Sequence, residues 1–229
     1  MNATIRWSLP PQAVLFDLDG TLADTAGDLG GAVNQLRLNR GLPAMPLEIL
    51  RGYASAGARG LIGVGLDIHP GHPEYDDLRL AFLDAYEQCL AQTTVLFDGM
   101  AELLTQLESA GLPWGVVTNK PHRFTIPVMQ GLKLDQRAAV IISGDSTAHA
   151  KPHPLPLLTA CEQIGVAPAA TLYVGDDLRD IQAAIAAGMP SAAAAWGYLG
   201  HEHNIHDWGA DVITAQPQDL WALLQTERP

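Results

Sequence analysis

The side chains best suited to chemistry are carboxylates that follow short apolar runs. Asp17 and Asp19 directly follow such a run at residues 13–16, and Asp176 follows another at residues 171–174. On a strand, residues two apart point to the same side, so Asp17 and Asp19 would repel each other without a cation or a proton between them. Together with Asp176 they offer hard oxygen ligands, for which Mg²⁺ is the natural occupant. The sequence therefore predicts a magnesium site with Asp17, Asp19 and Asp176 as ligands.

A cation at these carboxylates favours phosphoryl transfer, because it screens the charge of a phosphate from an attacking carboxylate. Asp17 could then attack and form an aspartyl-phosphate. Asp19 could protonate the leaving alkoxide and later deprotonate the water that hydrolyses the intermediate. Lys151 and the Thr118 hydroxyl would stabilise the equatorial oxygens of the transferring phosphoryl group. These residues predict a phosphomonoester hydrolase.

The elements that must position these groups are short apolar strands that alternate with helices. Besides the two runs above, strands are expected at residues 114–118 and 139–142, weaker strands at 192–196 and 211–213, and helices at 99–110, 154–164 and 178–187. Runs that are apolar on both faces are typical of parallel strands covered by helices. The expected fold class is α/β, a Rossmann-like doubly wound parallel sheet. Its ligands bind at the carboxyl ends of the strands, where the carboxylates, Thr118 and Lys151 would converge.

An insertion separates the first two strong strands by nearly a hundred residues, more than one crossover needs. Residues 26–94 contain helical stretches, such as residues 78–91, and no convincing strand. We predict a helical cap at residues 26–94 and a catalytic core formed by residues 1–25 and 95–229. A cap that closes over a small phosphorylated substrate would exclude bulk water from the reaction.

Composition limits the partners of the chain. The 229 residues carry a formal net charge of −12, so nucleic acid and anionic membranes are not expected partners. The same charge repels a phosphate, so a phosphate site needs concentrated local cations. Two cysteines, no apolar signal segment in residues 1–11 and no run long enough to span a membrane lead us to expect a soluble cytoplasmic protein. Monomer and homodimer both stay open.

Four motifs, in order, resemble those of the phosphatase branch of the haloacid dehalogenase superfamily. They lie at residues 17–22, 117–121, 151–152 and 174–180, with the sequences DLDGTL, VTNKP, KP and VGDDLRD. The resemblance implies Asp17 as the nucleophile, Asp19 as the acid and base, and Mg²⁺ held by Asp17, the Asp19 backbone carbonyl and Asp176. It implies that Thr118 and Lys151 bind phosphate. Asn119, which follows Thr118 in the second motif, is expected to bind substrate or phosphate as well. It also places Asp177 and Asp180 around the metal's water shell.

Within the superfamily, two groups of phosphatases are similar to this chain. Residues 118–121, 175–181, 197–198 and 208–211 resemble the phosphoglycolate phosphatases, which are our first expectation. Residues 57–59 and 114–121 resemble the bacterial N-acetylmuramic acid 6-phosphate phosphatases, which are the alternative. A sugar-phosphate mutase would share all four motifs. A non-catalytic phosphate-binding regulator would be expected to have lost a motif residue, and none is missing.

Charged residues outside the motifs are weaker candidates. Arg51 and Arg59 lie in a small-residue stretch of the cap and are expected either to contact a substrate carboxylate or to be solvated. Lys120, His122 and Arg123 either face the cleft or form a charged first helical turn, and the second reading is slightly favoured. A group of histidines is spaced like transition-metal ligands, but no ligand set completes a tetrahedral site, so we expect a surface loop. These are His201, His203 and His206.

Overall fold

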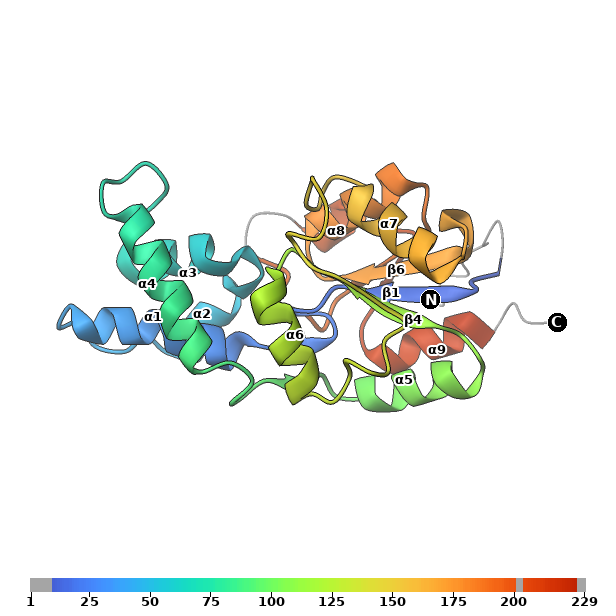
Figure 1. The fold of residues 1–229 in the computed structure, drawn as a ribbon, viewed down its shortest axis with the longest axis horizontal. Helices are drawn as coiled ribbons and strands as arrows, with labels where there is room; N and C mark the ends of the chain where they lie inside the picture. The colour runs from blue at the N-terminus through green and yellow to red at the C-terminus, as the bar shows by residue number, and fades with distance from the viewer. Residues whose placement is uncertain (1–9, 201–203, 226–229) are drawn as a thin grey trace.

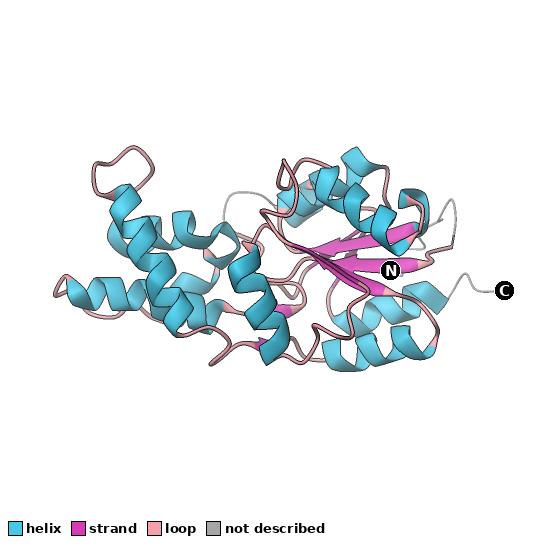
Figure 2. Cartoon of the chain, viewed as in Figure 1, coloured by secondary structure: helices cyan, strands magenta, loops and turns pink. Residues whose placement is uncertain are grey.

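Six parallel strands form the sheet at the centre of the core (Figures 1 and 2). The computed structural model describes residues 10–200 and 204–225. The strand order is β5-β4-β1-β6-β7-β8, so β1 lies between β4 and β6. The bounds are Ala13–Phe16 for β1, Trp114–Val117 for β4, Val140–Ile142 for β5, Thr171–Gly175 for β6, Ser191–Ala194 for β7 and Val212–Thr214 for β8. The predicted parallel sheet and all six of its expected strands are confirmed.

Helices cover both faces of this sheet, as Figure 1 shows for the pair α5 and α9 on one side and the pair α7 and α8 on the other. Their bounds are Met100–Ser109 for α5, Leu155–Ile164 for α7, Leu178–Ala187 for α8 and Pro217–Gln225 for α9. Side chains of β1 alternate between the two faces, as the pleat requires. Val14 and Phe16 pack with the leucines of α5 and α9, whereas Leu15 packs with α7 and α8. The doubly wound α/β architecture is therefore confirmed.

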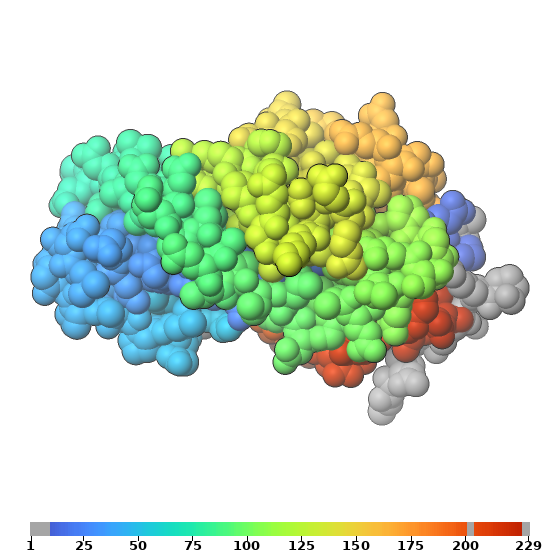
Figure 3. Space-filling model, turned by 60° about the horizontal axis from the view of Figure 1, so that its bottom comes forward, coloured from blue at the N-terminus to red at the C-terminus, as the bar shows by residue number. Residues whose placement is uncertain are grey.

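The cap is a separate group of helices with its own apolar core. Its helices are α1 (Ala26–Asn39), α2 (Leu47–Arg51), α3 (Gly57–Leu66) and α4 (Tyr75–Gln88), with the short 3-10 helix η1 (Ala54–Ala56) before α3. Buried apolar residues of these helices, including Leu29, Val33, Ile62, Phe82 and Tyr86, pack against one another. In the space-filling view the cap segments, blue to teal, adjoin the core at one end of the molecule (Figure 3). The helix expected at residues 78–91 begins and ends three residues earlier than predicted.

A short antiparallel pair joins the two connections between cap and core. β2 (Ala23–Asp24) pairs with β3 (Val95–Leu96), and neither strand was expected from the sequence. Strands of two residues are too short to show an alternating pattern. Close by, the buried Asp28 carboxylate accepts hydrogen bonds from the hydroxyls of Thr93 and Thr94. The predicted cap boundaries at residues 26 and 94 stay a prediction, and this pairing beside them supports it.

Other elements complete the description. α6 (His122–Gly131) follows β4, and the 3-10 helices η2 (Pro168–Ala170) and η3 (Ile205–Asp207) lie in the second half of the chain. His206 is exposed in η3, whereas His201 and His203 lie outside the described residues. No helix among the described residues is long and apolar enough to cross a membrane.

Candidate active site

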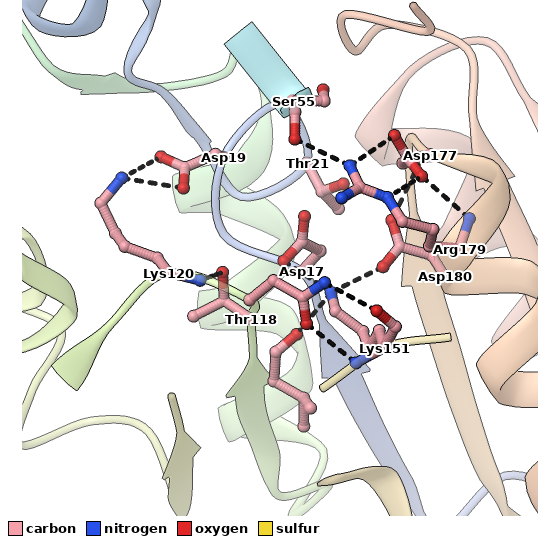
Figure 4. A network of polar contacts seen from close by, with 12 residues as sticks. Asp17, Asp19, Thr21, Ser55, Thr118, Lys120, Lys151, Asp177, Arg179 and Asp180 are labelled. Carbon is pink, nitrogen blue, oxygen red and sulfur yellow. Dashed lines mark hydrogen bonds and ion pairs between the residues drawn. The ribbon is translucent and has the colours of Figure 1, made fainter. Parts of the chain in front are cut away.

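Three aspartates gather where β1 and β6 end. One carboxylate oxygen each from Asp17, Asp176 and Asp180 lies within 4.8 Å of the others. β1 ends at Phe16, so Asp17 and Asp19 lie beyond the strand and its alternation does not orient them. Both side chains line the same cavity, but the Asp19 carboxylate lies outside the three-aspartate cluster and meets Lys120 (Figure 4).

Lys151 supplies the positive charge of this cluster. Its buried ammonium donates to Asp17 Oδ1 at 2.8 Å and Asp180 Oδ1 at 2.6 Å. It also donates to the Val117 carbonyl and the Tyr173 hydroxyl, at 2.9 and 2.8 Å. Burial alone would lower the pKa of Lys151, but Asp17 and Asp180 outweigh it and raise that pKa. The lysine is therefore a fixed cation beside Asp17.

Asn119 and Thr118 lie where β4 ends. The Asn119 amide oxygen accepts from the Lys151 backbone N–H and its amide nitrogen donates to the Lys151 carbonyl, both at 2.9 Å. This reciprocal pair fixes the backbone from which the Lys151 side chain extends. Thr118 is buried, and its hydroxyl oxygen accepts from the Lys120 backbone N–H at 3.2 Å. Both residues line the same cavity as Asp17 and Lys151. That Asn119 binds phosphate itself stays a prediction, because its described contacts position Lys151.

Asp176 is the most enclosed carboxylate of the cluster. It accepts hydrogen bonds from the Thr21 hydroxyl at 2.8 Å, the Tyr198 backbone N–H at 2.9 Å and the Ser55 hydroxyl of the cap at 3.1 Å. Burial raises the pKa of Asp176 well above its usual range, and the nearby charges of Asp17 and Asp180 raise it further. Only Asp17 and Asp180 pair with the Lys151 ammonium, so the three crowded carboxylates keep uncompensated negative charge and fit a divalent cation with oxygen ligands.

Small residues let the chain approach Asp176 closely. A Cβ atom at Gly197 would lie 2.2 Å from the Cβ atom of Asp176. Gly20, which adopts a φ of +90°, would place a Cβ atom 2.2 Å from the Asp176 carboxylate. A side chain at either glycine would displace the carboxylate, so the Asp-Gly turn of the first motif has a packing role as well as a conformational one.

Asp177 and Asp180 begin α8 with a capping box. The Asp177 carboxylate accepts from the Arg179 backbone N–H at 2.9 Å, and Asp180 Oδ2 accepts from the Asp177 backbone N–H at 3.1 Å. The Arg179 guanidinium pairs with the Asp177 carboxylate and donates to the Ser55 carbonyl at 2.8 Å. Arg179 thus connects α8 to the cap (Figure 4). Arg179 lies within the fourth motif but has no role predicted from the sequence.

Asp19 forms a second ion pair at the edge of the cavity. Lys120 donates to both Asp19 oxygens, at 2.6 and 2.8 Å, and the Thr25 hydroxyl donates to one of them at 2.5 Å. Lys120 is buried beneath the cap, over the ring of Tyr86. The slightly favoured reading of Lys120 as part of a charged helical turn was therefore wrong. Both of its neighbours, His122 and Arg123, are exposed and do not line the cavity.

A cavity of about 310 Å³ separates the cap from the core. Its core wall carries the ion pairs described above, and its cap wall carries apolar and aromatic side chains with two arginines. The cap residues that line it include Leu29, Arg59, Tyr75, Arg79, Phe82, Leu83 and Tyr86, and the core adds Phe124. The arrangement can hold an anion at Asp17 and Lys151 and enclose the group attached to it.

Of the two cap arginines predicted to meet a substrate, one lines this cavity and the other does not. Arg59 is among the lining residues. Arg51 instead pairs with Asp24 at 2.9 and 2.6 Å and lies over the Tyr198 ring. Its predicted contact with substrate is not supported, because Asp24, distant in sequence, holds its guanidinium outside the cavity.

Comparisons with known proteins agree with this geometry. The family profile described as haloacid dehalogenase-like hydrolase matches residues 14–194. An N-acetylmuramic acid 6-phosphate phosphatase from Pseudomonas putida is 45% identical over 215 residues, which cover 94% of this chain and 96% of that protein. A phosphoglycolate phosphatase from Xanthomonas campestris is 48% identical over 211 residues, 92% of this chain and 95% of that protein.

Solved structures share the whole architecture. A crystal structure from Haemophilus somnus, described as a predicted phosphoglycolate phosphatase, superposes with a TM-score of 0.82 at 25% identity. The match covers 95% of this chain and all of the other. With its four motifs at one cavity and its relatives named as phosphatases, the chain belongs to the haloacid dehalogenase-like hydrolase family, within its phosphatases.

Proposed function

We propose that this protein is a Mg²⁺-dependent phosphomonoester hydrolase that acts through an aspartyl-phosphate at Asp17. The observation that carries the proposal is the Asp17 carboxylate in a cavity, 2.8 Å from the buried Lys151 ammonium and next to Asp176 and Asp180. Asp17 and Asp176 would hold the cation, with the Asp19 backbone carbonyl as a further ligand and Asp180 close by. When bound, Mg²⁺ neutralises phosphate charge and orients the phosphoryl group.

The reaction divides between two aspartates. The Asp17 carboxylate attacks phosphorus, the ester P–O bond breaks, and Asp19 gives its proton to the leaving alkoxide. Asp19, now ionised, then takes a proton from the water that attacks phospho-Asp17. The acyl P–O bond breaks, inorganic phosphate is released, Asp17 returns to a carboxylate and Asp19 to its protonated form. Lys151 and the Thr118 hydroxyl hold the phosphoryl oxygens during both steps. Lys120 keeps the Asp19 side chain at the cavity, where the leaving group must lie.

The cavity wall supports a substrate larger than a two-carbon acid. The relatives are named for two substrates, 2-phosphoglycolate and N-acetylmuramic acid 6-phosphate, and both carry a carboxylate as well as a phosphate. A two-carbon acid would leave the aromatic cap wall uncovered, whereas the faces of a sugar ring pack well on aromatic side chains. We therefore rank N-acetylmuramic acid 6-phosphate ahead of 2-phosphoglycolate, which was the first expectation from the sequence.

Phosphate release tests the reaction. The parent enzyme is assayed on a panel of both substrates and common sugar phosphates, with Mg²⁺ and with chelator. We expect Asp17→Asn to lose at least about 1,000-fold in kcat while its circular dichroism spectrum is unchanged. Asp84→Asn makes the same chemical change at an exposed position and should keep full activity. An active Asp17→Asn enzyme would refute the nucleophile, and a phosphate moved to another position of the same sugar would indicate a mutase.

A further inference from the structure

Two arginines of the cap wall have no partner in this cavity. Among the described residues, five cationic and four acidic ones line it, and these four acids are all paired: Lys151 with Asp17 and Asp180, Lys120 with Asp19, and Arg179 with Asp177. The remaining cations are Arg59 of α3 and Arg79 of α4. Neither guanidinium forms an ion pair or hydrogen bond with any residue that the structure describes. Their charge is therefore available to an anionic group of a ligand.

Tyr86 also lines the cavity, and its hydroxyl is buried beside Lys120. Tyr86 is 2% exposed, and its hydroxyl meets no described residue at hydrogen-bond geometry, although the Lys120 ammonium lies near enough to lower its pKa. An ammonium can only donate to this oxygen, so the hydroxyl proton has no acceptor among the described residues. The ring is held by Phe82 and Phe124, with centroids 6.4 and 5.3 Å away. Burial raises the pKa of Tyr86 to about 12, so the hydroxyl keeps its proton and can donate. Buried hydroxyls rarely stay unpaired, which points to an acceptor on a bound ligand.

One face of α4 carries both groups. The α4 residues that line the cavity are spaced by four, three, one and three positions, a helical stripe: Tyr75, Arg79, Phe82, Leu83 and Tyr86. Arg79 and Tyr86 are two turns apart, about 10 Å along the axis at 1.5 Å per residue. Tyr86 lies beside Lys120, which binds Asp19, so it marks the catalytic end of the stripe. Arg79 lies nearer the start of α4, farther along the chain from β3, which follows the end of that helix.

We propose that this face of α4 is the subsite for the leaving group and selects phosphate esters of long carboxylic acids, such as a carboxylated sugar. The Tyr86 hydroxyl donates to an oxygen of the leaving group near the ester. Arg79 binds a carboxylate farther along the same molecule. The inference rests on the proposed function of Asp17. A two-carbon acid carries its carboxylate next to the ester, so its phosphate at Asp17 would leave Arg79 unused.

Binding to a non-reacting enzyme tests Arg79 without depending on turnover. In the Asp17→Asn background, calorimetry compares N-acetylmuramic acid 6-phosphate with N-acetylglucosamine 6-phosphate, which lacks the lactyl carboxylate. Adding Arg79→Gln should weaken the first by about tenfold or more and the second by less than about twofold. The control is Arg137→Gln, an exposed arginine outside the cavity, which should change neither. An unchanged affinity ratio after Arg79→Gln overturns the carboxylate role.

Tyr86→Phe tests the hydroxyl and keeps the ring packing. We expect it to weaken both sugar phosphates by about five- to tenfold relative to phenyl phosphate, which has no oxygen beyond the ester. Equal losses for all three compounds would overturn the hydroxyl role, because they would indicate a change in the phosphate site instead. If the parent enzyme failed to release phosphate, the proposed function would fall, while these affinities would still decide the subsite.

Discussion

Asp176→Asn is the sharpest test of the metal site, because it changes charge and little else. The amide keeps the shape of the carboxylate and can still accept from the Tyr198 backbone N–H. It can also donate to the hydroxyl of Thr21. It removes one negative charge from three carboxylates that lie within 4.8 Å of one another. Measured without and with Mg²⁺, the variant therefore separates two effects on stability: the repulsion among the three carboxylates and the stabilisation by a bound cation.

The expected size follows from binding linkage. A ligand at 100 times its dissociation constant stabilises the folded state by about 2.7 kcal/mol. For a chain of this length each kcal/mol raises Tm by about 2–4 °C, so saturating Mg²⁺ should raise the Tm of the parent protein by roughly 5–10 °C. In Asp176→Asn that rise should nearly vanish. In chelator the variant should be at least as stable as the parent, because burial and like charges disfavour the ionised Asp176.

Thermal denaturation followed by circular dichroism, first in chelator and then with added Mg²⁺, measures both effects at neutral pH. Asp84→Asn serves as the control and should show the full Mg²⁺ response. An equal rise in Tm for Asp176→Asn and the parent would show that the cation binds elsewhere. A variant several kcal/mol less stable than the parent in chelator would mean that the hydrogen bonds of Asp176, and not its repulsions, dominate the apo protein.

Three further changes test the surrounding network. Lys151→Met should lower the unfolding free energy by about 3–5 kcal/mol in chelator, because it leaves the buried aspartates without their counter-charge. Urea denaturation measures this free energy. The control Lys133→Met, at an exposed position, should lower it by less than about 0.5 kcal/mol. Tyr198→Phe deletes the hydroxyl that accepts hydrogen bonds from two backbone N–H groups at the start of α1. We expect the unfolding free energy to fall by about 1–3 kcal/mol in the same urea assay. An unchanged unfolding free energy would contradict this role. The hydrogen bond from Arg137 lowers the pKa of Glu108 below 4.5, so the pair stabilises the fold above that pH and the gain is lost as pH falls below it. Both side chains are over a third exposed, so the gain is under about 1 kcal/mol, and an unchanged pH dependence of stability in Glu108→Gln would refute it.

The sheet and the placement of the four motifs were predictable because their signals are local and strong. Strands buried on both faces read as continuous apolar runs, and β1 and β6 are such runs. Helices α7 and α8 end at Gly165 and Gly188, which adopt φ values of +72° and +67° that favour glycine. The convergence of strand ends then follows from topology alone.

The directions of individual side chains were not predictable, because their partners are distant in sequence. Asp19 forms an ion pair with Lys120, and Arg51 forms one with Asp24. Neither pair corresponds to a periodic pattern in the sequence. Arg79 and Tyr86 do lie on a helical stripe. That stripe indicates a buried face without saying whether it meets a core or a cavity. The site's framework is therefore a property of the motifs, whereas its specificity is a property of tertiary packing.

The distribution of charge explains how an acidic protein can receive a phosphate. The chain has 13 lysines and arginines, and five of them line one cavity. At physiological ionic strength charges are screened beyond about 8 Å in solvent, so the exposed carboxylates that produce the net charge of −12 contribute little inside the cap. The electrostatic environment of a substrate in the cavity is therefore set mainly by the lining residues, whose four carboxylates are already paired with cations. The two cations left over, Arg59 and Arg79, lie on the cap, so under the proposed subsite an anionic leaving group would gain its extra binding energy from the cap.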